Sequence, residues 1–535
     1  MGAIDSMPRG ERWRTLRHNG VAFPPPYVPK GLKLGFKGYW ISLGLEAEEM
    51  AYSWAKKKDG PHASDLTFRN NFWKDFQRIL PPDFEGANLD DLDFSQFNAF
   101  VDMETREKLS LSTDQKRRLA AERKKVKEAM KRQFGYVEID GRRVEIQNWM
   151  VEPPGIFVGR GLHPLRGRWK RRIGYRDVIL NLDADAPIPP GNWGGIVHDR
   201  SSIWLASWKD ELTGKVKYVW PHESSFIIQK NNKLKYIRAA KLGSYIDRVR
   251  DHIERGLTSD EERIRKVATV CYLIDHLCLR VGDEKDEDET DTVGATTLRV
   301  EHLKLDGDKI WFDFLGKDSV RWLKVLEEVN PSVILNLREF MVGKRPQDLV
   351  FDGVNSTKVN SFLNEAMRGL TARVFRTYHA SNVVRDYLWS ISDDLNEADQ
   401  DIKIFHAKVA NLKAAMLCNH KKTPPKNWEE VIRRREEKLK TLKGLVPKTD
   451  RQANDIRKKI RKAELALEIA KMTKEYNLNT SLKNYIDPRI YKAWSDHVGL
   501  DWTVIYPKGM QRKFSWVNRM ALDWTELKVR DLHRS

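Results

Sequence analysis

The spacing of apolar residues predicts a chain that is mainly helical between residues 226 and 420. Apolar side chains recur there every three or four positions, as they do along one face of a helix. One short β pattern interrupts this stretch. Strands are predicted at 298–305, 310–315 and 320–322, with a tight turn at Asp306-Gly307. We therefore expect a helical region that carries a small three-stranded meander with Lys317 at one tip.

Residues 421–475 show a different pattern, with 18 Lys and Arg against 9 Asp and Glu. Apolar residues recur there with alternating spacings of three and four on both sides of residues 444–448. This pattern is typical of two helices that pack as an antiparallel coiled coil. Because the two ends of such a pair lie close together, the segment is expected to be a protruding insertion before a separate, Trp-rich C-terminal piece.

The first 230 residues mix helical and extended patterns. Residues 70–76 indicate part of an amphipathic helix whose aromatic side chains enter a core. Ser112 and Gln115 form a capping-box pattern that opens a long basic helix, which Gly135 is expected to end. That helix is either a DNA contact or an ordinary solvated surface. From about residue 155, short β-rich runs such as 203–208 follow.

The composition points to a polyanionic partner. Of 535 residues, 95 are Lys or Arg and 76 are Asp or Glu, which gives a net charge of +19 and a pI of about 9.5. Nucleic acid is the first candidate partner and an anionic membrane surface the second. A hydrophobic share of 40% excludes a wholly disordered chain, and no apolar run is long enough for a membrane span. Three cysteines and no apolar leader indicate an intracellular protein.

A strip of cations lies in a stretch, 153–175, that contains no acidic residue. Six cations without a counter-charge repel one another unless an anion binds to them. We expect the strip to follow a phosphate backbone, with a solvated basic loop as the alternative. Its members are Arg160, Arg166, Arg168, Lys170, Arg171 and Arg172.

The sequence offers little for metal or nucleotide chemistry. The acidic run 283–291 lacks the central Gly and the oxygen spacing of a calcium loop. Asp183 and Asp185 form an Asp-x-Asp pair of the kind that a two-metal nuclease uses, but they stand beside loop signals. No phosphate-binding P-loop pattern occurs. We therefore expect neither a metal nor a cofactor.

A phosphodiester can also be cleaved without metal, by a side-chain nucleophile that attacks phosphorus while guanidinium groups neutralise the non-bridging oxygens. Such a site needs two Arg, a Lys or His acid and a nucleophile. The sequence pattern alone makes several residues candidates for such a catalytic site. The alternative interpretation of each is a surface ion pair with an acidic residue or the capping of a helix C-terminus. They are Arg280 at a helix end, Arg376 and His379 on one helix face, His420 before Pro424-Pro425, and Lys317.

Ten motifs follow one another in a fixed order and make the chain recognisable. They are Glu152-Pro153-Pro154-Gly155, Gly159-Arg160-Gly161, Lys170-Arg171-Arg172-Ile173, Leu279-Arg280, Asp291-Thr292-Val293-Gly294, Leu298-Arg299-Val300-Glu301-His302, Phe314-Leu315-Gly316-Lys317-Asp318-Ser319, Val374-Phe375-Arg376-Thr377-Tyr378, Leu417-Cys418-Asn419-His420, and Asn484-Tyr485-Ile486-Asp487-Pro488-Arg489-Ile490. With them the chain resembles eukaryotic-type DNA topoisomerase I, the type IB family, from about residue 11 to its end.

The resemblance implies a role for each catalytic position. Tyr485 would be the nucleophile that forms a 3′-phosphotyrosyl bond. Arg280 and Arg376 would hold the non-bridging oxygens of the scissile phosphate, and His420 would hydrogen-bond one of them. Lys317 would be the general acid for the leaving 5′-hydroxyl. These roles agree with the high ordinary pKa of tyrosine, which requires cationic help, and with the bidentate fit of Arg to phosphate.

The resemblance also implies inhibitor contacts, and the chain departs from the family at a few positions. Camptothecin-type inhibitors would contact Arg160, Asp318 and Asn484. Val158 stands where many relatives have Arg, His379 replaces a common Asn, and Leu482-Lys483 reverses the usual order. None of these departures removes a catalytic group.

The implied protein is a monomeric, multidomain α+β clamp around duplex DNA. Residues 1–230 would form a cap lobe, 231–420 the catalytic lobe, 421–475 a coiled-coil linker and 476–535 a small helical domain with Tyr485. It would relax positive and negative supercoils without ATP or metal, in the nucleus of a eukaryote or the cytoplasm of an archaeon. A tyrosine recombinase and a non-catalytic DNA clamp are the alternatives.

Overall fold

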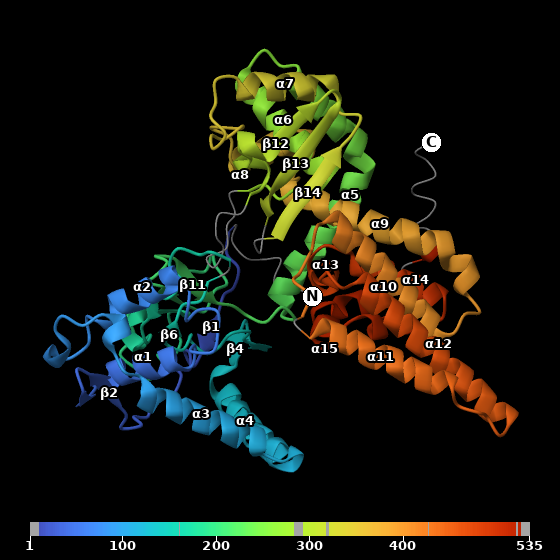
Figure 1. Ribbon diagram of the computed structural model, residues 1–535. Coiled ribbons are helices and arrows are strands. Elements are labelled where there is room, and N and C mark those ends of the chain that lie inside the picture. The colour runs from blue at the N-terminus through green and yellow to red at the C-terminus, as the bar shows by residue number, and fades with distance from the viewer. Residues whose placement is uncertain are drawn as a thin grey trace. The chain divides into compact units, whose positions relative to one another are not determined.

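The computed structural model describes residues 10–159, 161–282, 293–316, 320–425, 427–520 and 523–525. The chain separates into two compact units, with described residues up to Ile228 in the first and from Gln229 in the second. Helices combine with several small sheets, so the chain is a multidomain α+β protein (Figure 1). The three cysteines are buried and form no disulfide. In the described part of the chain, no helix has both the length and the apolar character that crossing a bilayer requires.

The first unit combines four described helices with short strands. The helices are α1 (Leu45–Ala55), α2 (Leu66–Phe76), α3 (Ser95–Ser110) and α4 (Thr113–Phe134). The strands are β1 (Leu16–His18), β2 (Lys33–Phe36), β3 (Tyr39–Ser42), β4 (Tyr136–Ile139), β5 (Arg142–Glu145), β6 (Gly155–Ile156), β7 (Trp169–Lys170), β8 (Val178–Asn181), β9 (Gly195–Val197), β10 (Ala206–Lys209) and β11 (Val216–Val219). They form sheets in the orders β1-β4-β5, β11-β10-β8-β9, β2-β3 and β6-β7.

The helix predicted around residues 70–76 is confirmed as α2. Phe68, Phe72 and Phe76 are spaced by four, lie on one face and are fully buried. Asp65 caps the helix by accepting a hydrogen bond from the Phe68 amide at 3.1 Å. The β-run predicted at 203–208 is present in part, since β10 begins only at Ala206.

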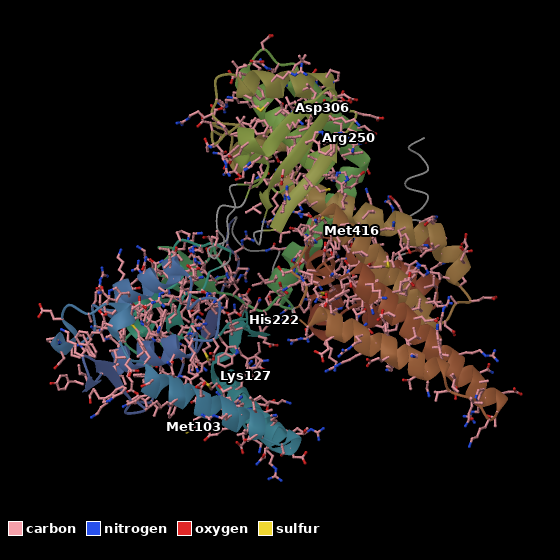
Figure 2. All side chains as sticks on the ribbon, in the orientation of Figure 1. Met103, Lys127, His222, Arg250, Asp306 and Met416 are labelled. Carbon is pink, nitrogen blue, oxygen red and sulfur yellow. The ribbon has the colours of Figure 1, made fainter. Side chains whose placement is uncertain are left out.

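The capping box predicted for α4 is also confirmed. The Ser112 amide donates to Gln115 Oε1 at 2.8 Å, and the Gln115 amide donates to Ser112 Oγ at 3.2 Å. The helix ends at Phe134, with Gly135 as its C-cap. None of its described side chains is buried, and Lys127 in Figure 2 lies on this exposed helix.

The second unit is mainly helical, with one antiparallel sheet in the order β12-β13-β14. Its strands are β12 (Leu303–Asp306), β13 (Lys309–Gly316) and β14 (Val320–Leu326). Its helices are α5 (Phe226–Leu257, which starts just before the unit), α6 (Glu262–Leu277), α7 (Pro331–Met341), α8 (Ser356–Ala366), α9 (Ala372–Leu395), α10 (Gln400–Leu417), α11 (Trp428–Lys443), α12 (Asp450–Met472), α13 (Leu478–Asn484), α14 (Pro488–His497) and α15 (Lys508–Lys513).

The predicted meander is present, but its first strand is shorter than expected. Residues 300–302 form a 3₁₀ turn in which His302 Nδ1 accepts the Arg299 amide at 3.0 Å, so the strand begins only at Leu303. This local side-chain hydrogen bond competes with strand pairing, which the apolar pattern could not reveal. Gly307 has φ +60° and makes the predicted turn between β12 and β13.

Two hydrophobic cores hold the second unit together, and α9 contributes to both. Phe375 and Tyr378 belong to the core around α6, α7 and the meander. Ala380, Val384 and Leu388 belong to the core of α10 and the C-terminal helices. Arg376 to Ser381 therefore lie where the helix passes from one core to the other.

The segment 421–475 forms two packed helices, α11 and α12, which lie side by side in Figure 1. Ion pairs such as Lys471–Glu436 at 2.6 Å cross between them. The ends of the pair are joined, because the Lys422 amide donates to the Glu475 carbonyl at 2.8 Å and the Asn477 amide to the His420 carbonyl at 2.7 Å. Those bonds place the start of the C-terminal piece beside His420.

Candidate active site

Arg376 is a charged residue in the interior of the second unit. It lies on α9 between the two cores and is only 4% exposed. Its Nη2 donates to the Cys418 carbonyl at 2.9 Å and lies 3.4 Å from His420 Nε2. Among the described residues no carboxylate pairs with it, and its Nε has no hydrogen-bond partner. A buried guanidinium in this condition is ready to bind an anion.

His420 is buried directly beside Arg376. Helix α10 ends at Leu417, Asn419 takes a left-handed conformation with φ +51°, and the His420 amide returns to the Ala415 carbonyl at 2.8 Å. Burial, together with the positive charges of Arg376 and Arg280, lowers the pKa of His420 to about 2. The imidazole is therefore neutral at physiological pH and can act as a hydrogen-bonding group rather than a cation.

Tyr485 packs against both of these residues. It is the C-cap residue of α13 and immediately precedes the turn into α14. Its ring centroid lies 4.7 Å from the Arg376 guanidinium carbon and 5.2 Å from the His420 ring, with which it stacks at 27°. Burial acts to lower the pKa of Arg376, but Tyr485 and two neighbouring cysteines raise it above its ordinary value. Arg376 thus keeps its charge beside the tyrosine.

Arg280 lines the same pocket as Arg376 and His420, a cavity of about 70 Å³. The expectation that it ends a helix is wrong. Helix α6 stops at Leu277, because Cys278 turns the chain with φ +52°. Arg280 follows outside any helix or strand, and its carbonyl accepts the Ala295 amide at 2.8 Å. The second arginine therefore comes from a loop, while the first comes from a helix.

Arg376 and His379 are one helical turn apart, yet they have different partners. His379 Nε2 lies 2.7 Å from Asp275 Oδ1 on α6. Arg250, which Figure 2 labels on α5, donates to the same carboxylate at 2.8 Å. Burial acts to raise the pKa of Asp275, but these two partners hold it below its ordinary value. His379 belongs to this buried carboxylate network, which ties three helices together.

The expectation that the cations of the basic strip have no counter-charge is wrong, because its described cations form ion pairs. Acidic residues distant in the sequence supply the counter-charges that the local segment lacks. The pairs are Arg166 with Asp65 at 2.6 Å, Arg168 with Asp75 at 2.7 Å, Lys170 with Glu152 at 2.9 Å and Asp210 at 3.0 Å, Arg171 with Asp177 at 2.7 Å and Glu211 at 2.6 Å, and Arg172 with Glu49 at 3.1 Å. Mutual repulsion is thus no argument for a bound phosphate, and the DNA-binding role stays a prediction.

Several predicted site residues lie outside the described residues. These are Arg160, Lys317 and Asp318, together with the acidic run 283–291. Asn484 is described and exposed, and its backbone carbonyl accepts a hydrogen bond from Lys235 Nζ at 2.6 Å. It therefore stands next to Tyr485 with its side chain at the surface.

The Asp-x-Asp pair has a structural role. Asp183 is buried, accepts the amides of Leu16 at 3.3 Å and Asp185 at 2.7 Å, and lies 3.6 Å from Arg17. Three or more potential metal ligands do not come together anywhere in the described part of the chain.

Three polar residues that position the tyrosine segment were missed by sequence reasoning. Ser381 on α9 bonds to the backbone on both sides of Ile486. Asn411 on α10 accepts from Ser481 Oγ at 2.7 Å and donates to the Leu478 carbonyl at 3.1 Å. Lys235 is the third. No local pattern could identify them, because each acts on a segment about 70 or more positions away.

The assembled groups define a class of site: an anion-binding pocket made of two arginines and a neutral histidine, with a tyrosine beside it. Such a set can neutralise a phosphodiester and present a hydroxyl nucleophile to it, which is the chemistry of tyrosine-dependent DNA strand transfer.

Three family profiles match consecutive parts of the chain. They are the DNA-binding fragment of eukaryotic DNA topoisomerase I at residues 11–221, its catalytic core at 224–453 and the C-terminal topoisomerase domain at 457–526. Together they cover residues 11–526 almost without a break.

Individual relatives agree with the profiles. DNA topoisomerase 1 of Homo sapiens is 35% identical over 557 residues, which cover 96% of this chain and 72% of the human protein. DNA topoisomerase 1 of Candidozyma auris is 41% identical over a region that covers 81% of this chain and 58% of the Candidozyma protein. DNA topoisomerase 1 alpha of Arabidopsis thaliana is 36% identical over a region that covers 95% of this chain and 58% of the Arabidopsis protein. The chain belongs to the eukaryotic DNA topoisomerase I family of type IB enzymes, which are DNA-binding isomerases.

Proposed function

We propose that this chain is itself a type IB topoisomerase that relaxes positive and negative supercoils in duplex DNA. It cuts one strand, allows the free end to rotate and rejoins the strand. The single observation that carries the proposal is the buried Arg376, which has no carboxylate partner among the described residues and stands 4.7 Å from the ring of Tyr485. An anion beside this guanidinium would be within reach of the tyrosine hydroxyl.

The proposed reaction is a reversible transesterification. The Tyr485 oxygen forms a bond to the scissile phosphorus and loses its proton, while the bond from phosphorus to the 5′ oxygen breaks and that oxygen takes a proton. The product is a 3′-phosphotyrosyl ester and a 5′-hydroxyl end. Since one ester replaces another, bond energy is conserved, and religation reverses the step without ATP or metal.

Each proposed role rests on the charge of the group. Arg280 and Arg376 neutralise the non-bridging oxygens, and His420 donates a neutral hydrogen bond to one of them. Lys317 supplies the proton to the 5′ oxygen, a role that the family resemblance implies. The pocket shared by Arg280, Arg376 and His420 supports the first three assignments.

Membership of the family supports the wider assignments that we propose. Arg160, Arg166, Arg168, Lys170, Arg171, Arg172, Asp318 and Asn484 contact DNA, and Arg160, Asp318 and Asn484 contact camptothecin-type inhibitors. A monomeric, two-lobed clamp would divide into a cap lobe (1–230), a catalytic lobe (231–420), a coiled-coil linker (421–475) and a tyrosine domain (476–535). The relatives' family works in the nucleus, and we propose the nucleus for this chain.

The test is relaxation of a supercoiled plasmid in EDTA without ATP, by the wild type and by Tyr485→Phe. We expect the wild type to relax the plasmid and to form a covalent adduct after denaturation, whereas Tyr485→Phe does neither yet binds DNA with unchanged affinity. Tyr476→Phe, a half-buried tyrosine nine positions away, is the matched control and should behave as wild type.

Four outcomes would contradict the proposal. An adduct with the Phe variant would assign another nucleophile. Loss of activity in EDTA would indicate a metal-dependent nuclease, and binding without relaxation would indicate a non-catalytic clamp. Joining of ends between two different duplexes would indicate a recombinase.

A further inference from the structure

The segment that carries Tyr485 is a short link between two helices. Tyr485 follows the last residue of α13, and Asp487 is the N-cap of α14, so only Ile486 stands between the two caps. The amides of Tyr485 and Ile486 both donate to the Ser481 carbonyl, at 2.9 and 3.1 Å. The Tyr485 carbonyl and the Asp487 amide are left for partners outside the link.

Ser381 provides the partner for both of these groups. Its hydroxyl donates to the Tyr485 carbonyl at 3.3 Å and accepts the Asp487 amide at 3.0 Å. The side chain is 7% exposed and lies on α9. A single hydroxyl therefore bonds the backbone on both sides of Ile486.

The same helix also carries Arg376, five residues before Ser381. One α-helix thus holds the guanidinium that contacts the Tyr485 ring and the hydroxyl that holds the Tyr485 backbone. Because the helix backbone is rigid, these two contacts define the distance between the tyrosine and the anion-binding arginine. We infer that Ser381 is a positioning residue, which holds Tyr485 for attack on the phosphate beside Arg376; the inference rests on the proposed function.

Losing the Ser381 hydroxyl should slow the chemical step. In Ser381→Ala the link keeps its helices and the buried Ile486, but the Tyr485 backbone can shift relative to Arg376. A misplacement of about 1 Å can cost a reaction about 100-fold. We expect single-turnover DNA cleavage to fall about 10- to 100-fold, while the dissociation constant for DNA changes less than about twofold because Ser381 contacts no DNA in this scheme.

The matched control is Ser392→Ala. Ser392 lies on the same helix and is also buried, but its hydroxyl donates to the Leu388 carbonyl at 2.6 Å, within its own helix and not to the tyrosine link. We expect it to cleave at the wild-type rate. Ser381→Thr retains the hydroxyl and should recover cleavage to within about threefold of wild type. All rates are measured at a temperature at which circular dichroism shows that each variant is folded. If Ser381→Ala fails to fold, Ser381→Cys takes its place.

A substrate in which sulfur replaces the scissile 5′ bridging oxygen distinguishes a misplaced nucleophile from a missing general acid. Sulfur leaves without an acid, so it restores a variant that lacks the general acid but cannot restore one whose nucleophile is misplaced. We expect the Ser381→Ala defect to persist on this substrate. The inference is overturned if Ser381→Ala cleaves like Ser392→Ala, or if sulfur restores its rate. Failure of the wild type to cleave either substrate would instead overturn the proposed function.

Discussion

At the scale of single residues, the site depends on burial that changes what each group can do. Arg376 keeps its charge although it is buried, and His420 loses its charge because it is buried between positive neighbours. A positive guanidinium thus lies beside a neutral imidazole, and this pair of groups can attract an anion and hydrogen-bond it at neutral pH. Two substitutions test this description.

The stability of the protein should depend on pH through His420. The folded pKa is about 2 and the ordinary value is 6.5, so below pH 6.5 the unfolded chain takes up a proton that the folded chain does not. Stability from this group is present above pH 6.5 and is lost as the pH falls. Between pH 7.5 and 5.5 the loss is about 1.4 kcal/mol. His420→Gln should remove this part of the pH dependence in denaturant unfolding, and equal slopes for both proteins would contradict the buried neutral state.

His420→Gln also tests the catalytic role, because the amide can donate a neutral hydrogen bond as the imidazole does. His420→Ala loses one such donor, so its cleavage rate should fall about 100-fold. The cleavage rate of His420→Gln should fall by a smaller factor. The measurement is single-turnover cleavage. A cationic role for His420 would be indicated if the wild-type rate showed an inflection near pH 6.5 that the Gln variant lacks.

Lys317 is expected to act as an acid rather than as a charge. If so, both Lys317→Arg and Lys317→Ala should cleave normal DNA poorly with little change in affinity, because Arg has a pKa above about 12 and gives up its proton reluctantly. Cleavage of the substrate with the sulfur leaving group should be nearly insensitive to either change. The same defect on both substrates would reassign Lys317 to binding.

At the scale of elements, the site is built where secondary structure ends. Arg280 follows α6, His420 follows α10 and Tyr485 follows α13, whereas Arg376 alone lies inside a helix. Close backbone packing surrounds one of these ends, because Gly294 lies against the segment that carries Arg280. A Cβ at this position would lie 2.4 Å from Gly282 Cα and 2.9 Å from the Arg280 carbonyl oxygen.

Gly294→Ala should therefore disturb both stability and cleavage. Backbone atoms cannot move aside like a side chain, so the cost is about 1–3 kcal/mol, and the segment that carries Arg280 must shift. Thermal unfolding and single-turnover cleavage measure the two effects. Gly509→Ala is the control, since a Cβ there meets nothing within 4 Å and lies in a helix, where Ala is favoured. If Gly294→Ala matched this control, the tight packing at Arg280 would not matter.

At the scale of the whole molecule, the net charge of +19 should govern DNA affinity. Each phosphate neutralised by a cation releases counterions, so the slope of log affinity against log salt is about −0.9 per contact. A protein that encloses the duplex makes many such contacts, and five alone give a slope of about −4.5. Fluorescence anisotropy with a labelled duplex at several salt concentrations measures it. A slope equivalent to one or two contacts would contradict an enclosing clamp.

Pairing within the protein modifies this electrostatic picture. The basic strip contains no local acid, which led to the expectation of mutual repulsion, yet Asp65, Asp75, Glu49 and others pair with its described members. Such distant pairing is invisible in one segment of sequence because it depends on how the chain folds. We therefore expect the exposed cations of α4 and of the α11 and α12 pair to contribute to the salt dependence together with the strip.

The sequence by itself determined the features that depend on local order. The amphipathic helix α2, the capping box of α4 and the turn at Gly307 follow from side-chain periodicity and backbone preference, and the ordered motifs identified the family. The chemical types of the site residues could also be named, because guanidinium, imidazole and phenol groups have fixed properties.

Only the tertiary structure decided which of those groups meet and in what charge state. The contacts of Arg376 with Cys418, His420 and Tyr485 join positions 42 or more residues apart, and the low pKa of His420 exists only because folding removes water from it. The same holds for Ser381, whose importance lies in a backbone link 104 positions away. Local pattern contains no information about such contacts, since they arise from the packing of two cores around one helix.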